Sequence, residues 1–335
     1  MKKTIALLTA AGMMLTAISP VMAADSAVES AVSEVEAVAA EESGILNEST
    51  DAYEESYVLI PSEDGRYDIP AIINVPTGEI KGAVVMLHGT GSTKNEAGDG
   101  YKTAAPVLSE KYGIATVRID FTGYGDSEAD DKLYDFSSAV NDAVSARNYV
   151  AANYDVDKFA VMGWSQGGTD ALLSAGKLPE LWDAVVTWAG APDLSDMLSD
   201  EDYAEAQENG FFEMEYDFRG PSEVSLQWCE DVKNTDVLDV FSAYAGPVLA
   251  IYGTQDDTVD PVWSDRIVET STNKDSATYP IEGMDHTFNV FSEEDLHSLH
   301  DAIDATGSFL AAEFSVSADS AAESVVESAA ESVEG

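Results

Sequence analysis

The sequence predicts an α/β fold in which helices cover both faces of a mostly parallel sheet. Short apolar, β-branched runs alternate with longer stretches of helical periodicity, which is the pattern of repeated strand–helix units. The central runs, such as 83–88 and 159–164, are continuously apolar, as expected for parallel strands buried on both faces. The chain has 335 residues, of which 45% are hydrophobic, and this is enough to bury a large core.

We expect eight strands, five helices and one insertion. The strands are 57–60, 71–74, 83–88, 114–120, 159–164, 184–189, 248–252 and 277–281. The helices are 103–111, 137–154, 166–175, 264–270 and 295–310. Residues 191–245 form an interval too long for a plain crossover helix, so we expect a small inserted cap there. The cap interval contains the large side chains Phe211, Phe212, Met214, Tyr216, Phe218 and Trp228.

The N-terminus has the pattern of a secretory signal peptide. Two lysines precede an apolar run over 5–18, and Ala23 ends a small-residue cleavage site. The apolar run is shorter than the ~20 residues of a membrane span. We therefore expect residues 1–23 to be removed, leaving a secreted protein with no membrane span.

Both ends beyond the signal peptide are acidic and of low complexity. Residues 24–56 hold ten acids and no Lys or Arg, and residues 311–335 repeat Ala, Ser and Glu. We interpret both segments as solvated tails, with docking segments or cell-wall tethers as the alternative. Their removal leaves 57–310 as the α/β domain, which includes the cap at 191–245.

The charge of the chain excludes several partners. Its 63 Asp and Glu outnumber 16 Lys and Arg, so the formal net charge is −47. Such a surface repels nucleic-acid phosphates and anionic lipids, and it favours a neutral ligand over an anionic one. Four His and a single Cys argue against a metal site or a disulfide framework. The lone cysteine, Cys229, is expected to be a buried apolar residue.

The strongest functional signal is Gly-Trp-Ser-Gln-Gly at 163–167. It directly follows an apolar strand and precedes an apolar helix, which is the setting that the Gly-x-Ser-x-Gly motif requires. The flanking glycines allow a tight turn that exposes the hydroxyl of Ser165 at the carboxyl edge of the sheet. The helix that begins at Gln166 directs its positive dipole end toward the same place. We therefore predict that Ser165 is a nucleophile.

A serine hydroxyl needs a base that removes its proton. Of the four histidines, His88 ends a strand, while His297 and His300 lie three residues apart on the last helix, where a polar face is the simpler interpretation. His286 remains, in a loop after the last strand, and we predict that it is the base.

The imidazole needs a carboxylate that fixes its tautomer and stabilises its charged form. The loop after strand 248–252 holds three acids within five residues. Asp256 is nearest to the end of the strand and is our choice, with Asp257 as the alternative. We assign Asp260 to the start of the following segment.

Acyl transfer also needs N–H groups directed at the oxyanion. The stretch His-Gly-Thr-Gly-Ser at 88–92 follows the third strand, where a glycine-rich loop can turn its amides inward. We predict that the amides of Thr90 and Gln166 form the oxyanion hole and that His88 anchors the loop. The loop lacks the Gly-Lys-Ser/Thr ending of a phosphate-binding loop. No metal or organic cofactor is expected.

These motifs, in this order, resemble the α/β-hydrolase family over residues 57–310. The stretch 118–127 also resembles the family's Gly-x-Gly-x-Ser loop. Within this family, the chain is most similar to bacterial feruloyl and cinnamoyl esterases. The features that carry this similarity are the Asp-Phe-x-Gly-x-Gly-Asp-Ser sequence of this stretch, the Ser-Gln-Gly-Gly elbow, the Gly-x-x-Asp turn, the Asp-His-x-Phe ending and the small cap. The resemblance implies an α/β-hydrolase fold and hydrolysis of carboxylic esters, with hydroxycinnamates on plant cell-wall polysaccharide as substrates. It also implies oxyanion donors at Thr90 and Gln166. Thr90 stands where members often carry an aromatic residue, a difference that concerns substrate preference.

We therefore expect a secreted serine esterase that forms an acyl-enzyme with a small-molecule or polysaccharide-linked ester. One alternative is a serine peptidase of the prolyl-oligopeptidase type, although such enzymes usually carry a propeller for which 57–310 has no room. A second alternative is a non-catalytic extracellular binding module on a hydrolase scaffold. The cap aromatics either stack on a phenolic acyl group or pack a small core within the cap.

Overall fold

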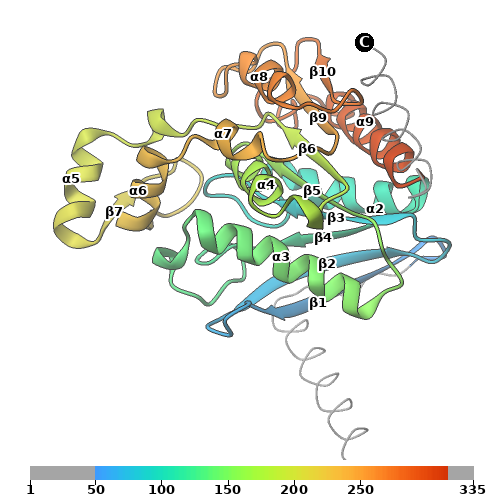
Figure 1. Cartoon of the computed structure of the whole chain (residues 1–335), viewed down its shortest axis with the longest axis horizontal. Helices are drawn as coiled ribbons and strands as arrows, with labels where there is room; N and C mark the ends of the chain where they lie inside the picture. The colour runs from blue at the N-terminus through green and yellow to red at the C-terminus, as the bar shows by residue number, and fades with distance from the viewer. Residues whose placement is uncertain (1–49, 316–335) are drawn as a thin grey trace, which may run out of the picture. The chain divides into compact units, whose positions relative to one another are not determined.

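The computed structural model describes residues 50–315, so the predicted signal peptide and most of both acidic ends lie outside the described residues. All eight predicted strands are present and form one sheet, in the order β1-β2-β4-β3-β5-β6-β9-β10 (Figure 1). The strands are β1 (Tyr53–Pro61), β2 (Asp68–Pro76), β3 (Gly82–Leu87), β4 (Ile114–Ile119), β5 (Phe159–Trp164), β6 (Ala184–Trp188), β9 (Val248–Gly253) and β10 (Ala277–Ile281).

The sheet is mostly parallel. Only β1 with β2, and β2 with β4, pair antiparallel, and the six strands from β4 to β10 run in one direction. The register places Leu87 opposite Gly163 and Trp164 opposite Trp188. Because parallel strands end at the same edge of a sheet, the loops after β3, β5, β6 and β9 converge there.

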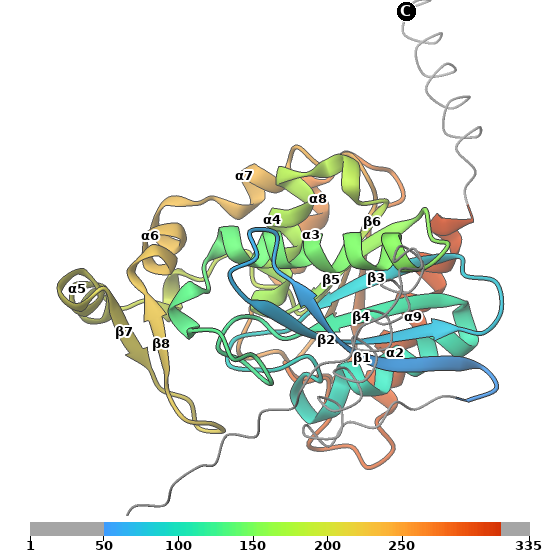
Figure 2. The ribbon, with the colours of Figure 1, turned by 90° about the horizontal axis from the view of Figure 1, so that it is seen from below.

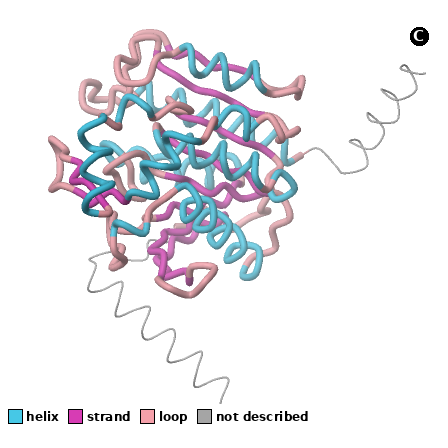
Figure 3. Tube along the Cα trace, turned by 60° about the vertical axis from the view of Figure 1, so that its left-hand side comes forward, coloured by secondary structure: helices cyan, strands magenta, loops and turns pink. Residues whose placement is uncertain are grey.

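Helices cover both faces of the sheet (Figures 2 and 3). Side chains alternate along β3, so Val84 and Met86 belong to one buried cluster, with residues of α2 and α9, whereas Val85 and Leu87 belong to the other, with α3 and α4. None of the helices within residues 50–315 is long and apolar enough to cross a bilayer. The longer helices of the domain are α2 (Gly100–Tyr112), α3 (Phe136–Asn153), α4 (Gln166–Lys177), α8 (Val262–Thr270) and α9 (His297–Phe314), and the short ones are η1 (Ala97–Asp99), η2 (Asp131–Leu133) and η3 (Pro179–Leu181).

The predicted cap interval folds as a compact insertion with its own small sheet, seen at the left of Figures 1 and 2. Sequence analysis did not predict the two antiparallel strands of this sheet, β7 and β8. Phe212, Trp228 and Cys229 are buried within the cap, which confirms the expectation for the cysteine. The cap elements are η4 (Ser195–Met197), α5 (Asp200–Asn209), β7 (Phe211–Met214), β8 (Ser222–Ser225), α6 (Leu226–Asn234) and α7 (Val237–Phe241).

The ordered domain extends beyond the predicted limits of 57 and 310. Residues 53–56, which we assigned to the acidic N-terminal segment, pair with β2. Glu55 accepts a hydrogen bond from Asn74 Nδ2 at 2.9 Å and forms an ion pair with the buried Arg118 at 3.2 Å. At the other end α9 continues to Phe314, whose ring lies against Gly82. These long-range contacts explain why acidic flanking residues belong to the fold.

Candidate active site

Ser165 occupies a sharp turn between β5 and α4. Its backbone has φ 56° and ψ −122°, a conformation that non-glycine residues rarely adopt. Its N–H donates to Trp188 O at 2.9 Å, which holds the turn on the neighbouring strand. A Cβ at Gly163 would lie 1.8 Å from Gly167 O, and one at Gly167 would lie 2.1 Å from Leu87 O. The turn therefore requires glycine at both positions.

His286 joins Ser165 to Asp256. Its Nε2 lies 3.1 Å from Ser165 Oγ, and its Nδ1 lies 2.9 Å from Asp256 Oδ2. The other carboxylate oxygen accepts the N–H groups of Thr258 at 2.9 Å and Val259 at 2.8 Å. The Asp256 side chain is only 1% exposed, and that of His286 is 15% exposed. A nucleophile, a base and a carboxylate thus form one hydrogen-bonded line with access to solvent at the serine end.

The alternative residues lie elsewhere. Asp257 is exposed, and the structure brings Asp256 rather than Asp257 to the imidazole. Asp260 accepts the N–H of Val262 at 3.0 Å, where α8 begins. His297 and His300 are exposed on α9.

Two contacts hold the His286 loop in place. Trp164 Nε1 donates to His286 O at 3.1 Å, so the loop is tied to the strand that carries the nucleophile. Asp285 Oδ1 accepts the N–H groups of Thr287 at 2.8 Å and Asn289 at 3.0 Å. The backbone around the imidazole is therefore fixed independently of the triad hydrogen bonds.

A side-chain relay links the two predicted oxyanion donors to the core. Thr90 Oγ1 donates to Gln166 Oε1, Gln166 Nε2 donates to Tyr134 Oη at 2.7 Å, and Tyr134 Oη donates to Asp170 Oδ2 at 2.7 Å. Within residues 50–315, the backbone N–H groups of Thr90 and Gln166 form no hydrogen bond. Two unpaired amides are thus held beside the serine by a buried chain of polar groups.

Sequence analysis missed Tyr134 and Asp170. Asp170 is fully buried on α4, four residues after Gln166. Burial raises the pKa of its carboxyl to about 7, because the charged form is poorly solvated. The available signal was an acid one helical turn after Gln166 in a helix with no other acid.

Buried polar groups also shape the glycine-rich loop after β3. His88 Nε2 accepts the N–H of Phe121 at 3.2 Å, and its Nδ1 lies 2.8 Å from Gly89 O, so Nδ1 carries the proton. Burial lowers the pKa of His88 to about 4, which keeps this anchor neutral. Glu96, which sequence analysis missed, accepts the N–H groups of Gly89 at 2.6 Å and Ala97 at 2.8 Å.

An ion-pair cluster locks this loop to the loop after β4. Lys94 Nζ lies 2.5 Å from Asp120 Oδ2 and 2.6 Å from Asp126 Oδ2. The Lys94 N–H also donates to Asp120 Oδ1 at 2.7 Å. A Cβ at Gly125 would lie 2.1 Å from the same oxygen, which explains a glycine of the 118–127 motif.

The cap aromatics divide into two groups. Phe212 and Trp228 pack together inside the cap, with ring centres 6.4 Å apart. Tyr216 and Phe218, in the turn 215–221 between β7 and β8, lie over Gly91, where a Cβ would be 2.7 Å from Tyr216 Cε1 and 3.1 Å from Phe218 Cζ. The first group confirms the interpretation of a small core within the cap, and the second group adjoins the oxyanion loop.

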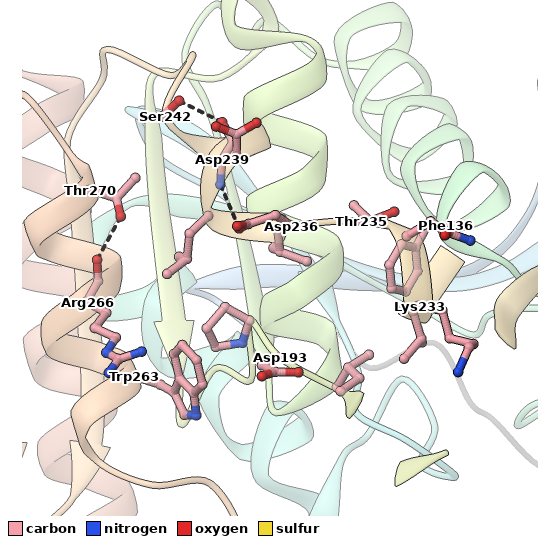
Figure 4. Close-up of a pocket in the computed structure, with 16 residues that line it drawn as sticks. Phe136, Asp193, Lys233, Thr235, Asp236, Asp239, Ser242, Trp263, Arg266 and Thr270 are labelled. Atoms are coloured by element: carbon pink, nitrogen blue, oxygen red, sulfur yellow. Dashed lines mark hydrogen bonds between the residues drawn. The ribbon is translucent and has the colours of Figure 1, made fainter. Parts of the chain in front are cut away.

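A cavity of about 750 Å³ opens beside the site, between the cap and α8 (Figure 4). Trp263 and Arg266 of α8 lie at one end, and Lys233 lies at the other end, in the cap. Pro192 lines it directly after Ala191, whose N–H donates to Ser165 O at 3.0 Å. Neither Ser165 nor His286 belongs to its lining, so the cavity is a neighbour of the triad rather than its pocket.

Two groups of acidic residues within the described part of the chain have the spacing of metal ligands. In the first, His297 Nδ1 lies 2.9 Å from Glu293, with Asp295 alongside. In the second, Asp130 and Glu223 are already paired with the ammonium of Lys132. Neither group includes a triad residue, and side-chain contacts within the described residues occupy both.

The chain matches a known family over just over half of its length. Residues 112–289 match the Prolyl oligopeptidase family. The human protein Serine hydrolase BPHL is 31% identical over 121 residues, a stretch that covers 36% of this chain and 40% of that protein. The alignment thus spans well under two thirds of this curated relative.

Solved structures share the fold at low sequence identity. Est1E from Butyrivibrio proteoclasticus, with ferulic acid bound, is 19% identical with a TM-score of 0.61, covering 77% of this chain and 100% of that chain. A putative hydrolase from Agrobacterium vitis S4 is 20% identical with a TM-score of 0.62, covering 77% and 99%. A puromycin-hydrolyzing peptidase of Mycobacterium tuberculosis is 18% identical with a TM-score of 0.57, covering 79% and 40%. The family match shows that the chain belongs to the prolyl oligopeptidase family, and the solved structures show that it has the α/β-hydrolase fold.

Proposed function

We propose that the protein is a secreted carboxylic ester hydrolase that forms an acyl-enzyme on Ser165, with hydroxycinnamate esters as its substrates. The observation that carries this proposal is the hydrogen-bonded line from Ser165 through His286 to Asp256. Ser165 attacks the ester carbonyl while His286 Nε2 takes its proton, and Asp256 stabilises the imidazolium.

The unpaired amides of Thr90 and Gln166 then donate hydrogen bonds to the carbonyl oxygen and stabilise the negative charge that develops on it. His286 returns its proton to the departing alcohol, and water hydrolyses the acyl-enzyme by the same route. Each step uses a group whose position is fixed by buried contacts, so little reorganisation is needed during the reaction.

The aromatic residues near the oxyanion loop support an aromatic acyl group. Tyr216 and Phe218 overlie Gly91, the residue that follows the proposed donor Thr90. A flat phenolic ring extending from Ser165 would meet these side chains and stack on them. The structural similarity to a protein with ferulic acid bound points in the same direction.

Peptide hydrolysis is the second candidate function, because the family match favours it. A proline-containing amide would use the same triad, but residues 50–315 contain no propeller that could select short peptides. The intact line of triad contacts argues against the third interpretation, a non-catalytic binding module. The signal-peptide pattern of residues 1–23 supports action outside the cell.

The test uses the purified wild type, Ser165→Ala and the control Ser308→Ala, an exposed serine of α9. Wild type and control should hydrolyse methyl ferulate and should be labelled by a fluorophosphonate. Ser165→Ala should lose both properties, with kcat lowered by about 10⁴-fold or more. Retained labelling in Ser165→Ala would contradict the assignment of Ser165 as the nucleophile. Turnover of a proline anilide but of no ester would favour peptide hydrolysis over ester hydrolysis.

A further inference from the structure

Arg219 places a positive charge beside the proposed acyl site. It belongs to the turn 215–221, and its Nη1 donates to Gly91 O in a long hydrogen bond of 3.5 Å. Its guanidinium carbon lies 4.9 Å from the ring centre of Tyr124 and 5.5 Å from that of Tyr216. The guanidinium is therefore stacked between two tyrosines instead of extending into solvent.

The platform beneath Arg219 is rigid. Tyr124 is only 6% exposed, and its ring packs against His88 at 5.5 Å and Tyr134 at 6.0 Å between ring centres. Its hydroxyl lies 3.5 Å from that of Tyr216. The residues that hold Arg219 are thus tied to the same buried groups that hold the oxyanion loop.

Part of the guanidinium is available for a ligand. Nε donates to Gly220 O at 3.2 Å and Nη1 to Gly91 O, whereas Nη2 has no partner within residues 50–315. Both partners are carbonyl oxygens, so no carboxylate of the described chain neutralises the charge. By contrast, the nearby Lys94 and Lys132 each form ion pairs with two acids. In a chain with 63 acids, an unpaired arginine at this position is a local reversal of the overall charge.

Arg219 lies within reach of an acyl group on Ser165. A Cβ at Gly89 would be 3.1 Å from Ser165 Cβ, so Gly89 adjoins the nucleophile. Gly91 is two residues further along, a separation of at most about 8 Å between Cα atoms. The guanidinium therefore contacts a residue that lies at most about 8 Å from the glycine beside Ser165.

We propose that Arg219 binds an acceptor oxygen at the far end of the acyl group. Two kinds of acyl group carry such an oxygen: a hydroxycinnamoyl ring with its phenolic oxygen, and a dicarboxylic half ester with its free carboxylate. Arginine hydrogen-bonds to oxygen through the N–H groups at the edge of its guanidinium, and Nη2 is the group that has no partner within residues 50–315. This inference rests on the proposed esterase function, and for the dicarboxylic half ester it changes one expectation: an anionic acyl group is accepted locally although the whole chain is negative.

The experiment compares wild type with Arg219→Gln on two matched pairs of esters. The first pair is methyl 4-hydroxycinnamate and methyl cinnamate, and the second is monomethyl glutarate and methyl pentanoate. Arg219→Gln should lower kcat/KM for the oxygen-bearing member of at least one pair by about 10- to 100-fold, and for its plain partner by less than about 3-fold. The pair that responds identifies the acyl group, and a carboxylate response should also weaken with added salt.

Two further variants give the controls. Arg266→Gln removes an arginine that is likewise stacked on an aromatic ring, 4.8 Å from the ring centre of Trp263. In each pair of esters, it should leave the ratio of kcat/KM for the oxygen-bearing ester to kcat/KM for its plain partner unchanged. Arg219→Lys keeps the charge and should restore part of the carboxylate preference. If Arg219→Gln lowers kcat/KM equally for the two members of each pair, or lowers it for none of the four esters, this inference alone is overturned. Wild-type protein that cleaves none of the four esters would overturn the proposed function and the inference together.

Discussion

The loops at the carboxyl edge of the sheet and the cap that overlies them are built in opposite ways. The loops are held by buried polar groups, such as Glu96 on the Gly89 amide and Asp120 on Lys94. The cap relies on a small apolar core, and its helix α5 begins with three acids and buries only Ala206. The turn that reaches the active site exposes 70% of Phe218.

The two regions serve two different steps of the proposed reaction, catalysis and substrate recognition. Transition-state stabilisation needs donors and bases fixed in advance, which the interlocked loops provide. Recognition of an acyl group needs side chains that differ between substrates, and those lie on the less buried cap. Substitutions in the loops should therefore change kcat or stability, whereas substitutions in the cap turn should change KM.

The largest expected effect is on kcat, and it should distinguish Asp256 from the adjacent Asp257 in the loop after β9. Asp256→Asn should lower kcat by about 10⁴-fold, because His286 loses the partner that fixes its tautomer and stabilises its charge. Asp257→Asn should change kcat by less than about twofold. Steady-state kinetics on a p-nitrophenyl ester measures both, and similar losses for the two variants would contradict the assignment.

Two glycine substitutions then compare the turn that carries Ser165 with the contact between Gly91 and the cap. Gly167→Ala places a Cβ 2.1 Å from a backbone oxygen and should destabilise the fold by about 3 kcal/mol or more. Gly91→Ala, at φ 71°, meets the side chain of Tyr216 and should cost about 1 kcal/mol while raising KM for an aromatic ester. Thermal melting and kinetics check both variants, and a lower kcat with unchanged KM for Gly91→Ala would break the comparison.

A third prediction concerns an acid buried in the helical layer. Asp142 of α3 accepts a hydrogen bond from Tyr67 Oη at 2.8 Å, and burial raises its pKa to about 8. The folded protein keeps this proton while the unfolded chain loses it, so the carboxyl's contribution to stability falls as pH rises from about 4 to 8. Asp142→Asn removes the titrating carboxyl and with it the loss of stability at high pH. It should therefore raise Tm by several degrees at pH 8 and by less at pH 5.

Calorimetry at the two pH values measures this effect. Glu208→Gln, an exposed cap residue, is the control and should leave Tm unchanged at both. An equal change in Tm at pH 5 and pH 8 for Asp142→Asn would show that the carboxyl does not titrate as described.

The smallest expected effect tests the relay beneath the oxyanion donors. Tyr134→Phe removes the hydroxyl that joins Gln166 to Asp170, and it should lower kcat about tenfold with KM unchanged, because the donors lose their support. Tyr203→Phe removes a matched hydroxyl in the cap, bonded to Glu230 at 2.5 Å, and should leave kcat unchanged. Steady-state kinetics on an acetate ester measures both variants. A rise in KM alone for Tyr134→Phe would show that Tyr134 supports substrate binding rather than the oxyanion donors.

The sequence predicted the elements whose signal is local. The eight strands were recognisable from short apolar, β-branched runs, and Ser165 from its motif between a strand and a helix. Asp256 was chosen over Asp257 because it is nearer to the end of a strand, and the structure places Asp256 beside the imidazole. In each case the deciding information lies within about ten residues of the chain.

The missed features depend on partners far away in the sequence. Tyr134 and Asp170 are 36 residues apart, and hydrophobic periodicity does not reveal which polar residues meet in the interior. Glu55 resembles the acidic tail until its ion pair with Arg118 is known. The cap strands β7 and β8 have four residues each and bury too few of them to show a clear period.

The turn 215–221 has both ends fixed, because Met214 pairs with Ser222 across β7 and β8. Its seven residues can therefore vary in length and chemistry while the elbow, the base and the amides keep their places. For directed evolution, a library confined to this turn should redistribute activity among acyl groups without a general loss of turnover. The same separation gives natural variants a route to new substrates in which the chemical machinery is inherited unchanged.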